Sequence, residues 1–298
     1  MDKICVIGIC GQSVFLQCKE LPKKGQSIEC SNLHIEPGGK GVNVATTIRR
    51  LGGDVSYLVS LGNDDYAKKC IDFFKDEDLA VAYQLKSGTT DYGVIMHDEK
   101  GNNCVSVFMD DNVKLSRQDV ESYEGELKDA KFVVVAAEVK DEVLLSIAEF
   151  CNKYDFKIIF DPSPVRDVPK SFMEKVWLFT PNETEYEKLF EKINPKKVVI
   201  TLGDKGALLI EDEQRIQFPA VKVKVKNTTG AGDVFNGALS FSLANGNDLP
   251  TAVQFAMRAA AYKVSGEYVV KNIPTIAQLN DFNNSIMLYD THTRRCDA

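Results

Sequence analysis

A short glycine-rich segment in the last third of the chain carries residue types suited to phosphate chemistry. Residues 227–233 read Asn-Thr-Thr-Gly-Ala-Gly-Asp and lead directly into an apolar run with helical spacing, from Val234 to Leu243. Glycines leave backbone N–H groups uncovered, and a helix start adds partial positive charge, so the segment could hold phosphate oxygens. Asp233 at the helix start could accept a proton from an attacking hydroxyl. A plain turn in which Asp233 caps the helix explains the same residues.

A second glycine-rich segment, residues 38–43, reads Gly-Gly-Lys-Gly-Val-Asn and also precedes a predicted helix. Apolar residues then recur every three positions from Val42 to Leu51, which is typical of one helix face. Lys40 and Asn43 therefore lie at a helix N-terminus, where they could bind a polyhydroxylated ligand or its phosphate. A loop that only joins two elements is the alternative.

Two further strand ends carry polar residues. Asn182 and Glu185 follow a strand-like run that ends at Thr180, and their spacing places them on one side of a helical turn. Such a pair suits the water shell of a magnesium ion, although the same residues also make a good helix start. Thr201 and Gly203 follow another strand, in a turn that resembles a strand-end loop near a nucleotide.

The elements that must position these loops alternate between strands and helices. Short runs of apolar, β-favouring residues recur, and several are almost continuous, as expected for strands buried on both faces. Helical patterns lie between many of them, which predicts a doubly wound α/β fold with a mostly parallel sheet. The predicted strands are Ile4–Ile9, Val55–Leu61, Phe132–Ala136, Lys157–Phe160, Trp177–Thr180, Lys197–Leu202 and Ala207–Ile210.

Two regions, about 13–35 and 81–108, break this alternation. They contain alternating polar and apolar residues, and Asn102 and Asn103 after Gly101 suit a hairpin turn. We expect short, half-exposed strands that form a small sheet projecting from the main body.

The bulk composition excludes several classes of function. The chain has 298 residues, 44% of them hydrophobic, which is enough for one large domain with a sizeable core. Its net charge of −7 argues against nucleic acid or an anionic membrane as the main partner. Three scattered histidines make a zinc site or a Ser-His-Asp triad a poor explanation. The absence of a long apolar segment favours a cytoplasmic protein.

These loops, in this order, resemble those of the ribokinase-like carbohydrate kinases, also called the pfkB family. The resemblance runs from Ile4 to about Phe282, and the segments 38–43 and 228–233 match the two signature motifs of the family. It implies a single kinase domain over residues 1–298, with a doubly wound α/β body and a small β-sheet lid. It also implies transfer of the γ-phosphate of ATP to a hydroxyl of a small sugar, with Mg²⁺ as cofactor.

The resemblance further implies a role for each matching residue. Asp233 would be the general base, and the backbone of Gly230, Ala231, Gly232 and Asp233 would form an anion hole for the transferred phosphoryl group. The acceptor sugar would contact Ser13, Gly39, Lys40, Asn43, Glu138 and Asp233. The nucleotide would contact Asn182, Thr201, Gly203, Thr229, Gly230 and Gly232. Magnesium would be held, through water, by Glu185 and Asn182.

The chain departs from the ribokinase pattern at two places. Ribokinases carry an asparagine and an aspartate after the first strand, where they bind sugar hydroxyls, whereas this chain has Gly11 and Ser13. Loss of these anchors argues against ribose, at a cost of roughly 1.5–3 kcal/mol for each lost charged hydrogen bond. Asn227 stands where the family has an aspartate that helps to hold a monovalent cation, so activation by potassium is left open.

Three questions stay open at the level of sequence. A nucleoside or phosphosugar kinase on the same fold is an alternative to a sugar kinase, because Gly11 and Ser13 leave room for another ring. A non-catalytic binding protein would also share the fold, but it should have lost Asp233 or the glycines. A homodimer through an apolar lid face carrying Val94, Met96, Val105 and Val107 is expected. The acceptor and its reacting hydroxyl are not specified.

Overall fold

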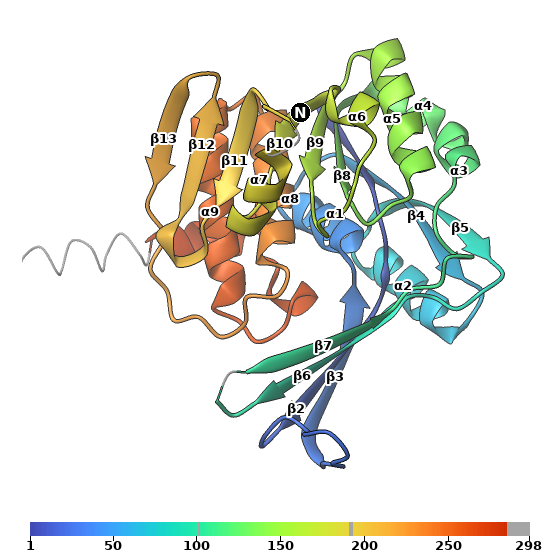
Figure 1. Cartoon of the computed structure of the whole chain (residues 1–298), viewed down its shortest axis with the longest axis vertical. Coiled ribbons are helices and arrows are strands. Elements are labelled where there is room, and N and C mark those ends of the chain that lie inside the picture. The colour runs from blue at the N-terminus through green and yellow to red at the C-terminus, as the bar shows by residue number, and fades with distance from the viewer. Residues whose placement is uncertain (101, 191–192, 285–298) are drawn as a thin grey trace, which may run out of the picture.

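A large, mostly parallel sheet forms the body of the molecule in the computed structural model, which describes residues 1–100, 102–190 and 193–284. In these ranges the sheet has nine strands, in the order β13-β12-β11-β10-β9-β8-β1-β4-β5 (Figure 1). The doubly wound α/β architecture predicted from the sequence is confirmed. The strands are β1 Lys3–Ile7, β4 Val55–Gly62, β5 Ala80–Lys86, β8 Ala130–Ala136, β9 Lys157–Asp161, β10 Val176–Phe179, β11 Lys197–Thr201, β12 Ala207–Glu211 and β13 Gln214–Phe218.

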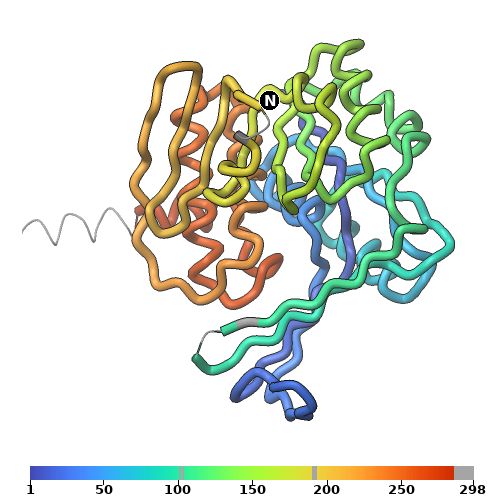
Figure 2. Tube along the Cα trace, in the orientation of Figure 1, coloured from blue at the N-terminus to red at the C-terminus, as the bar shows by residue number. Residues whose placement is uncertain are grey.

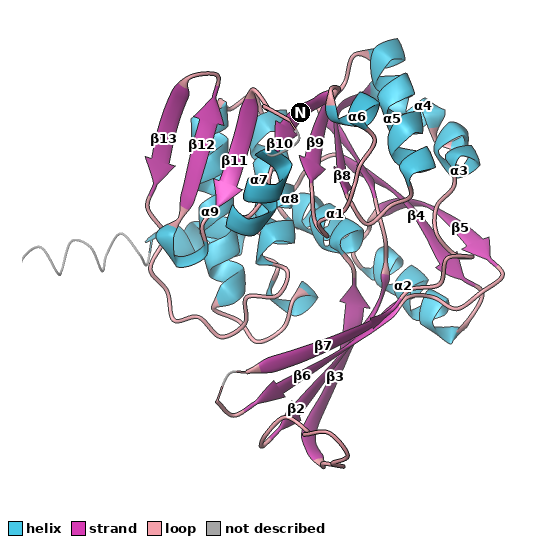
Figure 3. Ribbon diagram, in the orientation of Figure 1, coloured by secondary structure: helices cyan, strands magenta, loops and turns pink. Residues whose placement is uncertain are grey.

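Helices cover both faces of this sheet (Figure 3). Because successive side chains of a strand point to opposite faces, Ile4 and Val6 of β1 enter one core cluster, and Cys5 and Ile7 enter the other. The first cluster is closed by α1 Lys40–Arg50, α2 Asp65–Asp76, α8 Ala231–Ala244 and α9 Leu249–Val264. The second is closed by α3 Arg117–Ser122, α4 Glu124–Asp129, α5 Asp141–Tyr154, α6 Lys170–Met173 and α7 Glu183–Phe190.

The order of strands reverses beside β1. The chain runs from β1 through β4 to β5 in one direction, then from β8 through β9 and β10 to β11 in the other. β1 pairs in parallel with β4 on one side and β8 on the other. In open α/β sheets, ligands bind outside the carboxyl ends of the strands at such a reversal. The ends of β1 and β8 are therefore where a site is expected.

A second sheet of four strands projects from the body in the described residues, and we call it the lid. It consists of β2 Gly11–Cys18, β3 Cys30–Gly38, β6 Tyr92–Asp98 and β7 Asn103–Phe108, in the order β3-β2-β6-β7. Figure 2 shows the pair β2 and β3 beside the pair β6 and β7, although about 50 residues separate the two pairs in sequence. β5, whose residues fall within the range 81–108 expected for the lid, instead pairs with β4 at the edge of the main sheet.

The register of the lid corrects the expected apolar face. Val94 lies opposite Ser106 and Met96 opposite Cys104, whereas Ile95 lies opposite Val105 and Gly93 opposite Val107. Since paired residues point to the same face, Val94 and Met96 lie on the face opposite to Val105 and Val107. The four residues therefore do not form one patch.

The face of the lid that carries Val94 and Met96 faces away from the body. Leu33 and Ile35 of β3 share this face, and they are 59% and 41% exposed. On the opposite face, Phe15 and Ile95 pack against Val269 of the body. The lid is thus apolar on both faces, and its outer face has no cover in the described chain.

The remaining elements complete the frame around the site. Asp64 and Asp248 accept hydrogen bonds from backbone amides at the starts of α2 and α9, as favoured N-cap residues do. Residues 276–284, after Pro274, are helical as predicted, and the polar tail predicted for 290–298 lies outside the described residues. No helix within the described ranges has the length and apolar character needed to span a membrane.

Candidate active site

The glycine-rich segment before α8 adopts the geometry expected of an anion-binding turn. Gly230 caps the helix with φ +73°, in the left-handed region, and a Cβ on it would lie 2.5 Å from a methyl group of Val269. Within the described chain, the amides of Gly230, Gly232 and Asp233 donate no hydrogen bond, whereas Ala231 donates to Thr228. Three N–H groups are therefore available to a ligand at the positive end of the helix.

Asp233 lies next to these amides, and α1 holds its carboxylate. Asn43 Nδ2 donates to Asp233 Oδ2 at 2.7 Å, and Lys40 Nζ lies 3.4 Å from Asp233 Oδ1. Lys40 Nζ also contacts Asp161 Oδ2 at 3.1 Å. The structure thus brings together Lys40, Asn43 and Asp233, which the sequence analysis had singled out on two separate helices, and adds Asp161, which it had missed.

Three carboxyl groups interact electrostatically with Lys40. Burial and the charge of Asp233 raise the pKa of Glu138 to about 8, although Lys40 acts in the opposite direction. Burial also raises the pKa of Asp161 to about 6 against the effect of Lys40. Burial alone would lower the pKa of Lys40, but the charges of Asp233, Asp161 and Glu138 raise it. Excess negative charge at this site therefore favours a cationic or hydrogen-donating ligand.

Buried side-chain oxygens without a hydrogen-bond partner surround the same place. Asn43 Oδ1, Glu138 Oε2 and Asn236 Oδ1 are unpartnered within the described residues. Lys40, Glu138, Asp161 and Asn236 line one small cavity at the ends of β1 and β8. A buried acceptor is costly to leave unpaired, so these oxygens are suited to a ligand that donates several hydroxyl hydrogens.

The expected magnesium residues lie two strands away, at the end of β10. Asn182 N donates to Glu185 Oε2 at 2.8 Å, and Glu185 N donates to Asn182 Oδ1 at 2.9 Å. This reciprocal pair begins α7, so the helix-start interpretation of these residues is correct at least in part. The Glu185 carboxylate is buried, and its charge helps to raise the pKa of Asp161. A buried carboxylate is a ligand type that suits a divalent cation.

The other expected site residues lie along the carboxyl edge of the sheet and at the lid base. Thr201 ends β11 and pairs with Asn182, and Gly203 opens an exposed turn after it. Ser13 lies in β2 at the base of the lid, beside Gly38. Neither Thr201 nor Ser13 belongs to the cluster of Lys40 and Asp233.

Gly11, the other departure from the ribokinase pattern, has a steric reason. A Cβ at this position would lie 2.0 Å from the backbone oxygen of Asp91, because the two chain segments that lead into the lid run side by side here, where β2 and β6 begin to pair in parallel. Gln12 N also donates to Asp91 O at 2.9 Å, which holds the two segments together. No larger side chain fits at position 11 without moving the lid.

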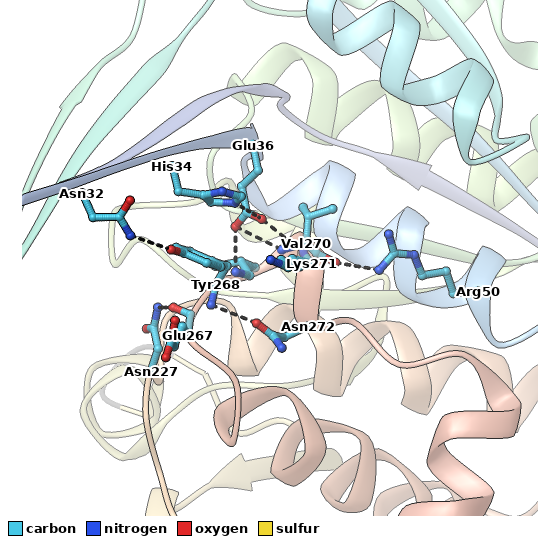
Figure 4. Close-up of polar contacts among 11 residues, drawn as sticks. Asn32, His34, Glu36, Arg50, Asn227, Glu267, Tyr268, Val270, Lys271 and Asn272 are labelled. Carbon is cyan, nitrogen blue, oxygen red and sulfur yellow. Dashed lines mark hydrogen bonds and ion pairs between the residues drawn. The ribbon is translucent and has the colours of Figure 1, made fainter. Parts of the chain in front are cut away.

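A polar cluster joins the lid to the body beside the site (Figure 4). Glu36 of β3 accepts hydrogen bonds from the amides of Val269, Val270 and Lys271, and its Oε2 lies 3.2 Å from His34 Nε2. The His34 ring stacks on Tyr268 with ring centroids 3.7 Å apart. The segment after α9 is therefore bound to the lid.

Sequence reasoning missed Asp161, Asn236, Glu36 and Lys263. Asp161 did carry a signal, because it directly follows a buried strand and precedes Pro162. Asn236 lies one helical turn after Asp233, within an otherwise apolar stretch. Glu36 and Lys263 are isolated charged residues that belong to no recognisable sequence motif. Only the fold brings Glu36 to Val269 and Lys263 to Thr229.

Comparison with known proteins identifies the family. Residues 1–276 match the pfkB family carbohydrate kinase model. The chain is 28% identical to the ribokinase of Bacillus subtilis (strain 168) over 92% of its own length and 97% of that protein, and 28% identical to the deoxyribokinase of Salmonella typhi over 94% and 98%. The crystal structure of ribokinase from Thermotoga maritima superposes with a TM-score of 0.86, at 28% identity, over 95% of this chain and 100% of that one. The chain belongs to the pfkB family of carbohydrate kinases.

Proposed function

We propose that this protein transfers the γ-phosphate of ATP to a hydroxyl group of a small sugar, with Asp233 as the general base. One observation carries the proposal: the Asp233 carboxylate lies beside three backbone amides without partners at the start of α8. A base next to an anion-binding turn is the arrangement that phosphoryl transfer to a hydroxyl requires. The similarity to ribokinase and deoxyribokinase supports a sugar as the acceptor.

The proposed reaction uses the site in a single displacement. Asp233 accepts the proton of the acceptor hydroxyl, and the oxygen attacks the γ-phosphorus while the bond to the β-phosphate oxygen breaks and ADP leaves. The amides of Gly230, Gly232 and Asp233 stabilise the charge on the transferred group. Asn43 orients the Asp233 carboxylate by its 2.7 Å hydrogen bond. Lys40, paired with Asp233 in the ligand-free site, would move to substrate oxygens.

The nucleotide and its metal would lie along the ends of β10 and β11. Thr201 and Gly203 would border the nucleotide, and Thr229 would contact its phosphates through the loop before α8. Glu185, with Asn182, would hold Mg²⁺ through water, which fits the burial of the Glu185 carboxylate and the effect of its charge on the pKa of Asp161. The ion would neutralise phosphate charge.

The acceptor would lie against the cluster of Lys40, Asn43 and Asp233, under the lid. Gly39, Ser13 and the unpartnered oxygens of Asn43 and Glu138 would receive its hydroxyl groups.

Asp233→Asn tests the proposal. Wild type should form ADP with at least one member of a panel of ribose, deoxyribose, hexoses and nucleosides. Asp233→Asn should lower kcat by about 10²–10⁴-fold, since that is the usual contribution of a general base. Asp72→Asn, an exposed change on α2, is the matched control and should leave kcat unchanged. A wild type that phosphorylates no acceptor, or an Asp233→Asn variant of full activity, contradicts the proposed function.

A further inference from the structure

A lysine is completely buried beneath the loop that precedes α8. Lys263, in the last turn of α9, has no exposed surface. Its Nζ donates to the backbone oxygen of Asn227 at 3.0 Å and also to that of Thr229. Within the described chain, no carboxylate lies within ion-pair distance of it. Lysine is rarely buried without an acidic partner, so backbone carbonyl groups of the loop hold this charge.

Lys263 keeps its charge at neutral pH. Burial lowers the pKa of Lys263 to about 8, while the charges of Glu36 and Asp233 act in the opposite direction. The group is therefore mostly an ammonium ion at pH 7, which fits its two contacts with carbonyl oxygens. The charge of Asp233 acts on it, so the field of Lys263 extends to the site of chemistry.

The position of the ammonium group fixes the direction of the loop amides. In a trans peptide, the C=O and the following N–H point in opposite directions. Because the Thr229 oxygen is turned toward Lys263, the Gly230 amide of the same peptide is turned away from it. That amide is one of the three without a partner in the described residues. Lys263 therefore holds a donor of the proposed anion hole in its orientation.

The side chain of Asn227 is fully engaged in holding the same loop. Its Oδ1 accepts from Thr229 N at 2.8 Å. Its Nδ2 donates to Glu267 O at 2.7 Å, as Figure 4 shows. It brings no negative charge to the loop. The inward carbonyl groups of Asn227 and Thr229 have the ammonium group of Lys263 as their cation.

We propose that Lys263 is a positioning residue for phosphate transfer, and that its ammonium group acts as a monovalent cation built into the chain. It would hold the carbonyl groups of Asn227 and Thr229 and aim the Gly230 amide at the transferred phosphoryl group. The protein then works without free potassium or ammonium ions. The inference rests on the proposed function, since the loop is taken to hold phosphate.

The first test uses wild type and its best acceptor from the panel. Turnover is measured with tetramethylammonium as the sole monovalent cation, and then with potassium or ammonium at equal ionic strength. We expect the same kcat in all three salts. Activation of wild type by potassium or ammonium overturns the inference without contradicting the proposed function.

The second test removes the charge. Lys263→Met keeps the length but not the ammonium group, and kcat should fall about tenfold or more with little change in the KM for the acceptor. Lys263→Ala should show the same loss but leave space beside the two carbonyl groups, so added potassium or ammonium should restore its turnover. Tetramethylammonium, which is too large, should not. The matched control is Lys226→Met, an exposed lysine next to the loop, which should behave as wild type.

A binding measurement keeps the test independent of turnover. Potassium should raise the thermal unfolding temperature of Lys263→Ala relative to tetramethylammonium, and it should have no such effect on wild type. A folded Lys263→Ala variant that no cation rescues or stabilises, or a Lys263→Met variant with the kcat of wild type, overturns the inference. If both variants fail to fold, the comparison of wild-type kcat in the three salts still tests the inference.

Discussion

At the scale of single residues, the site holds more negative than positive charge. Within the described chain, Lys40 is the cation paired with both Asp161 and Asp233, and burial with the charge of Asp233 raises the pKa of Glu138 against its effect, so a carboxyl group there is held partly in its neutral form. Such an arrangement is costly and is relieved when a ligand donates hydrogen bonds. Strain of this kind is characteristic of functional sites.

This charge distribution should appear in the pH dependence of stability. The pKa of Glu138 rises from 4.5 to about 8 on folding, so the folded state binds more protons than the unfolded state between these values. The free energy of unfolding should therefore fall as pH rises through this window. Glu138→Gln should remove part of the fall and stabilise the protein near pH 8 by a few kcal/mol, since one pKa unit is about 1.36 kcal/mol.

Urea unfolding of the ligand-free protein at the two ends of this window measures the effect. Glu142→Gln, at an exposed position on α5, is the control and should follow the wild-type curve. Parallel curves for Glu138→Gln and wild type would show that Glu138 does not titrate as described.

The residues that could be predicted from sequence are those whose neighbours in the chain define their role. Asp233 and Asn43 follow glycines at helix starts, and that local pattern is sufficient to select them. Lys263 and Glu36 could not be selected in this way. Their partners, Thr229 and Val269, lie 34 and 233 residues away, and only the tertiary fold creates those contacts.

At the scale of elements, local pattern predicted most strands of the sheet but misplaced β5 and missed β13, whose residues are mostly exposed. β4 is buried along its whole length and reads as an apolar run, as predicted. β5 alternates between polar and apolar residues because it is the edge strand of the main sheet, and such alternation is equally typical of the lid. The pattern of polar and apolar residues indicates which side chains of a strand are exposed, but it does not indicate which sheet the strand joins.

The entry into the lid offers a test at this scale. Gly11→Ala places a methyl group against the backbone of Asp91, where it would lie 2.0 Å from the carbonyl oxygen. We expect a loss of stability of about 1–3 kcal/mol and a raised KM for the acceptor, because overpacking must move the lid. Gly93→Ala on β6 is the control, since its Cβ meets no atom closer than 3.7 Å. Denaturant unfolding and steady-state kinetics measure the two effects, and equal behaviour of the two variants would refute the steric argument.

At the scale of the whole molecule, the outer face of the lid is an apolar surface that no element of the described chain covers. Leu33 and Ile35 are exposed there, beside Val94 and Met96. We retain the expectation of a homodimer through the lid, now on this face alone, because an exposed apolar sheet face favours pairing with a second copy.

Light scattering coupled to size exclusion tests this expectation. Wild type should have twice the 33.1 kDa mass of one chain, and Leu33→Glu should shift it to the monomer, since a buried unpaired charge is costly. Val107→Glu, an equally exposed valine on the other face, is the control and should remain dimeric. A monomeric wild type would contradict the proposal.

The reversal of strand order beside β1 has a consequence for how this chain could change over time. The proposed acceptor groups lie on β2, at the start of α1 and after β8, whereas the proposed nucleotide groups lie after β10, at the end of β11 and in the loop before α8. Mutations that reshape the sugar pocket can therefore accumulate without disturbing the machinery that handles the phosphates. Gly11 and Ser13 are differences of that kind. In such a molecule the acceptor specificity can change by single substitutions, while the residues that transfer the phosphate stay the same.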